Sequence, residues 1–144
     1  MKKIILTIIT IIWMGLIFAL SNDNATQSKK KSDTFIDRTI YKVCQVVSND
    51  CSKKDARKKY HYIIRKLAHF TEYFILGVLV IFTLREYGIK NVLVPLVFCA
   101  LYACSDEIHQ LFIKGRTGSI IDVFIDSSGS TVSILLLYYF YFTH

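Results

Sequence analysis

Hydrophobic and polar positions divide the chain into four long apolar segments with polar segments between them. The first apolar segment, 4–20, contains no charged residue and follows two lysines at the N-terminus. The others cover about 67–84, 91–112 and 119–142. Each comes close to the roughly 20 residues that a helix needs to cross the hydrocarbon core of a bilayer. The pattern therefore predicts four transmembrane helices.

Two of the polar segments between them are short. Residues 85–90, REYGIK, and residues 114–118, KGRTG, each contain a glycine and join successive apolar segments. Helices joined by such short connections lie antiparallel to each other. We therefore expect an all-α integral membrane four-helix bundle in up-down-up-down order, formed by residues 1–144 as a single domain.

The remaining polar segment, the basic loop 21–66, is long and contains one amphipathic stretch. Ile36, Ile40, Val43 and Val47 recur at the spacing of one helix face. A helix of this kind lies in the plane of a membrane surface, with its apolar side in the headgroup region. We expect an amphipathic interfacial helix in this loop.

Composition and charge agree with a multi-pass protein of the cell membrane. Hydrophobic residues make up 53% of the chain, and the mean hydropathy of +0.39 is high for a soluble domain. The net charge is +7, and the loop 21–66 carries 12 of the 18 Lys and Arg residues against five Asp. Basic segments beside membrane spans bind anionic lipid head groups. We expect the bilayer as partner, and no nucleic acid, because the spans on both sides hold this loop at the membrane.

Ionisable residues lie at those ends of the apolar segments that the up-down-up-down order brings to one membrane face. The second segment begins there, the third ends there and the fourth begins there. A carboxylate in the hydrocarbon costs on the order of 2.5–3.5 kcal/mol, so these side chains are expected to face inward, toward one another or toward water. Six of them form the predicted polar cup and are the candidate catalytic residues: His69, Glu72, Asp106, His109, Asp122 and Asp126.

Helical spacing places four of these residues in pairs. His69 and Glu72 are three residues apart, as are Asp106 and His109, so the members of each pair can share a helix face. Two such pairs on adjacent helices are similar to the carboxylate–histidine sites of helical bundles, which makes the four residues candidate ligands for a divalent metal ion. The HExxH motif is absent, and a His–carboxylate network without a metal explains the same pattern.

A phosphate site is a further option at the same face. Arg65, beside Lys66 at the mouth of the cup, and Arg116, in the KGRTG turn, can each hold a phosphate through two parallel hydrogen bonds. A lipid-linked phosphate would suit a cup that opens to the membrane interface. Proton-coupled transport also uses intramembrane acids, but the apolar far half of the bundle offers no polar exit path.

Helix packing alone explains some of the other polar residues. Ser130 and Ser133, with Gly129 beside them, lie along a seam of the fourth segment, and small residues let membrane helices approach closely. Glu107 projects to a different side of its helix from Asp106. We expect Glu107 to be a structural partner for a Lys or Arg side chain.

Two stretches resemble the VanZ-like family of small bacterial membrane proteins. They are RKLAHFTEYFILGVL, 65–79, and SDEIHQLFIKGRTGSIIDVFIDSSG, 105–129, and Ser21 also fits a Ser found after the first span of that family. Lys114 stands where the family tends to have Pro, and Ser133 replaces a Gly. The residues that match the family pattern are Arg65, His69, Glu72, Asp106, Glu107, His109, Gln110, Arg116, Asp122 and Asp126.

The resemblance implies a protein of the cell envelope and no particular reaction, because the family is named for a protein linked to teicoplanin resistance. Our first hypothesis is that the cup binds a lipid-linked cell-wall precursor or a glycopeptide and contributes to glycopeptide resistance, with Arg65, Glu107, Gln110 and Arg116 as ligand-binding residues. The alternative is a small intramembrane enzyme, metal-assisted, in which a His–acid pair acts as base on a lipid-linked phosphate substrate.

The distribution of basic residues predicts the orientation of the chain. The face with the cup holds 14 Lys and Arg residues and the other face holds four, so the positive-inside rule, which covers loops shorter than about 60 residues, places the cup toward the cytoplasm. We expect alkaline phosphatase fused after His144 to be active and a fluorescent protein fused there to be dark. The reverse result would place the cup outside, as the two N-terminal lysines favour.

Overall fold

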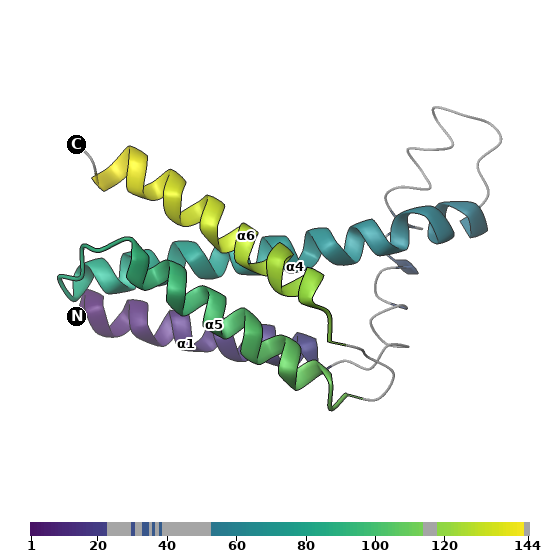
Figure 1. The fold of residues 1–144 in the computed structure, drawn as a ribbon, viewed down its shortest axis with the longest axis horizontal. Coiled ribbons are helices and arrows are strands. Elements are labelled where there is room, and N and C mark those ends of the chain that lie inside the picture. The colour runs from purple at the N-terminus through teal and green to yellow at the C-terminus, as the bar shows by residue number, and fades with distance from the viewer. Residues whose placement is uncertain are drawn as a thin grey trace.

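The computed structural model describes residues 1–22, 53–113 and 118–142, together with residues 30, 33, 34, 36 and 38. Its elements are α1 (Lys2–Ser21), α4 (Lys53–Glu86), α5 (Leu93–Gln110) and α6 (Ile120–Leu137), which continues into the π-helical turn η2 (Tyr138–Phe142). Successive helices run in opposite directions, and both termini lie at the same end of the bundle (Figure 1). The predicted all-α, up-down-up-down architecture is confirmed for this part of the chain.

Among the described residues, three stretches are long and apolar enough to cross a membrane: Lys2–Ser21, Tyr62–Glu86 and Ile120–Tyr141. Helix α5, with 18 residues, is not among them, because polar residues occupy its last two turns and lower its apolarity. The chain is thus a multi-pass membrane protein, and a crossing by α5 remains a prediction. Many large apolar side chains on α1 are exposed, among them Ile4, Ile8 and Ile12, as expected for a helix that faces lipid.

Helix α4 is longer than the apolar pattern alone predicts. It begins at Lys53 rather than near Leu67, so the last part of the basic loop is helical and extends past the end of the bundle (Figure 1). Neither Pro nor Gly occurs between Lys53 and Gly77, and Lys, Arg and Ala favour helix. Of the predicted amphipathic helix, only Ile36 lies within the described residues, where it is fully buried; Ile40, Val43 and Val47 lie outside them.

Helix α4 is the centre of the bundle, since it contacts α1, α5 and α6 and packs most extensively against α6. The core contains side chains from all four helices. Its buried members are Ile17, Tyr73, Leu76, Val80, Ile81, Cys99, Ala103 and Ile134. Helix α4 contributes more of these residues than any other helix, because it lies between the other three.

Small residues allow α4 and α6 to approach closely. A Cβ atom at Gly129 would collide with the carbonyl oxygen of Phe70, and one at Gly77 would collide with Ser133 Oγ. Ser130 Oγ donates to the Ser127 carbonyl at 3.0 Å and Ser133 Oγ to the Ser130 carbonyl at 2.9 Å, so neither hydroxyl is left unsatisfied in the contact. These interactions agree with the packing role that the sequence predicts for the seam.

Aromatic and basic side chains gather at the end of the bundle where both termini lie. The Lys3 ammonium is 5.8 Å from the centroid of the Tyr87 ring, and the Arg85 guanidinium carbon is 5.5 Å from that of Tyr138. The hydroxyls of Thr7 and Tyr87 are 3.2 Å apart. Tyr and basic residues mark the boundary between lipid and water. This end therefore corresponds to one membrane interface.

We expect Gly129→Ala to lower the free energy of unfolding by about 1–3 kcal/mol, because the added methyl group would overpack the contact between α4 and α6. Unfolding in mixed detergent and dodecyl sulfate micelles, followed by circular dichroism, measures this change. The matched control is Gly15→Ala in α1, where a Cβ atom would meet nothing within 4 Å. Equal stability of the two variants would contradict the close contact.

Candidate functional site

Buried polar residues gather at the end of the bundle opposite the termini, where α1 and α5 end and α6 begins. We call this set the polar cluster; its members are Ser21, Lys66, His69, Asp106, Glu107, Gln110, Asp122 and Asp126. Apart from Lys66, whose side chain is 11% exposed, all are at most 7% exposed. The chain thus has four buried carboxylates in one place. A buried charge is tolerated only when other groups compensate it. In this cluster, hydrogen bonds and ion pairs from neighbouring helices do so.

Asp106 connects α5 to the end of α1. The hydroxyl of Ser21, at the last position of α1, donates to Asp106 Oδ2 at 2.8 Å. Gln110 Nε2, one turn further along α5, lies 3.3 Å from the same oxygen. Hydrogen bonds to a charged acceptor are the stronger kind, so this carboxylate ties the ends of two helices together.

Glu107 connects α5 to the beginning of α6. Its Oε2 accepts the backbone N–H of Ser119 at 2.9 Å, and its Oε1 accepts from Gln110 Nε2 at 2.9 Å. Gly118 makes the approach feasible, because a Cβ atom there would lie 2.7 Å from the Glu107 carbonyl oxygen. The sequence predicts a structural Lys or Arg partner for Glu107. The two hydrogen bonds described here are with amides and are structural, and the basic partner stays a prediction.

Asp122 connects α6 to α4. Lys66 Nζ forms an ion pair with Asp122 Oδ1, and Arg65 Nη2 lies 3.7 Å from Oδ2. The Arg65 side chain is 34% exposed, so this second pair is at the edge of the cluster. Lys66 and Arg65 therefore neutralise the carboxylate nearest to the start of α6.

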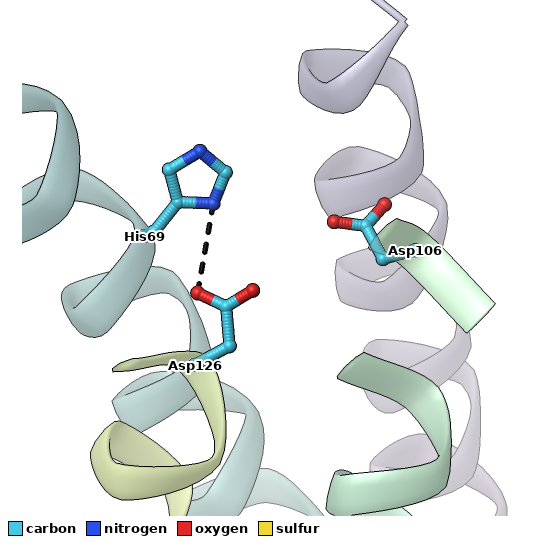
Figure 2. A group of neighbouring side chains, drawn as sticks. All are labelled: His69, Asp106 and Asp126. Atoms are coloured by element: carbon cyan, nitrogen blue, oxygen red, sulfur yellow. Dashed lines mark ion pairs between the residues drawn. The ribbon is translucent and has the colours of Figure 1, made fainter. Parts of the chain in front are cut away.

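His69 and Asp126 form the deepest part of the cluster. His69 Nδ1 on α4 lies 3.6 Å from Asp126 Oδ1 on α6, and Asp126 is fully buried. Asp106 points toward this pair from α5, and Figure 2 shows the three side chains around a common centre. Ligand atoms of His69, Asp106 and Asp126 all lie within 4.8 Å of one another. Three helices thus contribute to one group of potential metal ligands.

Two of the predicted cup residues do not belong to this group. Glu72 is half-buried, and its backbone carbonyl accepts a hydrogen bond from Trp13 Nε1 at 3.0 Å. The ring of His109 stacks on Phe18 of α1, with centroids 4.0 Å apart. The sequence pairs His69 with Glu72 and Asp106 with His109 as metal ligands, whereas the structure brings His69 and Asp106 together with Asp126. Arg116 lies outside the described residues.

The sequence pattern alone does not identify Ser21 and Lys66 as site residues. Ser21 enters it only through the family resemblance, and Lys66 only as a neighbour of Arg65. Lys66 precedes His69 by three residues, so the helical period places both on one face. That spacing is the signal that could have identified Lys66; for Ser21, a hydroxyl at the end of a span carries no comparable signal.

The chain matches the model of the VanZ/LLP1 family over residues 6–141, which include every member of the polar cluster. It belongs to the VanZ/LLP1 family. No curated protein and no solved structure matches it at a significant level. The matched residues begin within α1 and end within η2, so they include the buried polar end of the bundle.

The arrangement in this VanZ/LLP1 protein limits the chemistry of the cluster. Its four carboxylates outnumber the nearby cations Lys66 and Arg65, and both of these lie close to Asp122. Three further carboxylates, those of Asp106, Glu107 and Asp126, are buried in the same cluster. A cation can bind there directly, whereas an anion would have to approach through Lys66 and Arg65.

We expect Glu107→Gln to lower the free energy of unfolding by about 1–3 kcal/mol, because its amide group would place a donor against the donors of Ser119 or Gln110. Thermal unfolding of the purified protein in detergent measures the effect. Glu86→Gln, an exposed acid at the other end of α4, is the matched control and should leave the midpoint unchanged. A midpoint for Glu107→Gln equal to that of the control would show that the carboxylate does not fasten the start of α6.

Proposed function

We propose that this VanZ/LLP1 protein binds a lipid-linked ligand of the cell envelope at the polar cluster and thereby contributes to resistance against glycopeptides of the teicoplanin type. The observation that carries the proposal is the burial of four carboxylates and a histidine at one end of a membrane bundle. Polar and ionisable groups inside a membrane are costly and mark ligand or ion sites more often than they serve packing. The Gly and Ser seam already supplies the close helix packing.

The depth of the cluster suits a ligand whose head group lies at the membrane interface. Asp122 is in the first turn of α6, and Asp126 follows one turn later, so the deepest carboxylate is about 9 Å along the helix from Ile120 at 1.5 Å per residue. A head group at the membrane surface can reach this depth, while a chain of apolar groups extends beside α1 and α6. The apolar segments that flank the cluster match such an amphiphilic ligand.

The basic segment that leads into the cluster supplies attraction for an anionic head group. Helix α4 extends past the bundle through the sequence KKDARKKYHYIIRK, which ends with Arg65 and Lys66. Each basic residue near an anionic membrane surface contributes on the order of 1 kcal/mol to its attraction. Arg65, partly exposed and 3.7 Å from Asp122, is positioned to exchange this carboxylate for a phosphate of the ligand.

The proposal is tested in a glycopeptide-susceptible bacterium that produces the protein at a controlled level. We expect the wild-type chain to raise the minimal inhibitory concentration of teicoplanin, and Asp126→Asn and Asp106→Asn to abolish the increase, because each removes a charge that the binding site needs. Glu86→Gln serves as the matched acid-to-amide control and should retain the increase.

Membrane levels of each variant are measured by immunoblot in the same cells, so that loss of protein is distinguished from loss of function. An unchanged teicoplanin susceptibility in cells that contain the wild-type protein would refute the resistance function. Full resistance in Asp126→Asn and Asp106→Asn would show that the polar cluster is not the site.

A further inference from the structure

We infer that His69, Asp106 and Asp126 form a binding site for one divalent transition-metal ion, held between α4, α5 and α6. The inference rests on the proposed function, because it names the group through which the polar cluster would accept an anionic ligand. It follows from the chemical types of the three side chains, from the distances between their ligand atoms and from an unsatisfied oxygen of the Asp126 carboxylate.

The Asp126 carboxylate points into the centre of the cluster with one oxygen unsatisfied. The side chain is completely buried, and its Oδ2 has no hydrogen-bond partner among the described residues. A buried acceptor without a partner costs about 1–3 kcal/mol, and more when it is charged. The unsatisfied oxygen of this fully buried carboxylate therefore indicates that a ligand binds beside it.

The distance between His69 and Asp126 fits a shared ion better than a direct hydrogen bond. Nδ1 and Oδ1 are 3.6 Å apart, beyond the 2.7–3.2 Å that N–H···O hydrogen bonds prefer. With metal–ligand bonds of about 2.0–2.2 Å, neighbouring ligand atoms around one ion lie roughly 3.0–3.5 Å apart. The pair needs only a small movement to reach that separation. The ligand atom of Asp106 lies within 4.8 Å of those of His69 and Asp126.

The donor set selects the class of ion. One imidazole nitrogen and two carboxylate oxygens suit zinc or manganese better than magnesium or calcium, which prefer oxygen ligands. Three protein ligands leave a coordination position open for a further group. Two carboxylates balance the charge of a divalent ion, so the ion also relieves the repulsion between Asp106 and Asp126.

An ion at this place resolves a conflict of charge in the proposed function. The carboxylates of the cluster repel a phosphate or another anionic group, and Lys66 and Arg65 are both near Asp122. A divalent ion neutralises the two carboxylates at the centre of the cluster and presents its open coordination position to the ligand. The side chains of Ser21 and Gln110, which bond to Asp106 Oδ2, would orient this carboxylate as outer partners of the ion, a role that such groups fulfil in other metal sites.

The inference is tested with the full chain, purified through a tag that contains no histidine, treated with chelator and reconstituted in lipid nanodiscs. Isothermal titration with Zn²⁺ and with Mn²⁺ should show one ion per chain for at least one of them. At 100-fold excess over the dissociation constant, the ion should raise the unfolding midpoint by about 5–10 °C. Asp126→Asn and His69→Gln should each weaken binding by at least the 10–100-fold that loss of an outer partner costs, and Glu86→Gln should bind as the wild-type does.

If Asp126→Asn does not fold, Asp106→Asn and His69→Gln carry the test, since each removes one ligand. A folded wild-type protein that binds neither ion overturns the inference, and so does unchanged affinity in the folded ligand variants. Ion binding by a chain that confers no resistance would refute the proposed function and support the inference. Resistance that depends on Asp126 in a chain that binds no ion would do the opposite.

Discussion

A carboxylate buried inside a membrane bundle must be met by groups from neighbouring helices, and the structure of this protein is organised around that requirement. Ser21 of α1 donates a hydrogen bond to Asp106, and the Ser119 amide before α6 donates one to Glu107. Lys66 and His69, both on α4, pair with Asp122 and Asp126 respectively. Each acid thus joins its own helix to another. Because water and charged partners are scarce in the hydrocarbon, these contacts are difficult to replace, and they set how the helix ends are arranged.

Different interactions hold the two halves of the bundle together. At the polar end, the arrangement depends on directional contacts between charged and hydrogen-bonding groups. In the remainder, small residues such as Gly77 and Gly129 let α4 and α6 pack closely, and apolar side chains face lipid. The VanZ/LLP1 family match over residues 6–141 includes both halves.

The polar cluster combines a structural and a chemical capacity, and its residues divide accordingly. Glu107 accepts from the Ser119 amide, which fastens the start of α6 to α5, and from Gln110. Asp122 forms an ion pair with Lys66. His69, Asp106 and Asp126 converge instead on a common centre (Figure 2). Under the proposed function, the ligand chemistry therefore belongs to the deeper level of the cluster.

The sequence by itself determined the number and order of the helices and the membrane face at which the ionisable residues gather, because segment length, hydropathy and short glycine-containing links leave little choice of topology. Only the tertiary structure decided the partners. A spacing of three residues brings His69 and Glu72 near one face of α4, but the packing of α4 against α6 places His69 beside Asp126. Contacts such as Ser21 with Asp106 join positions 85 residues apart, and no local pattern contains that information.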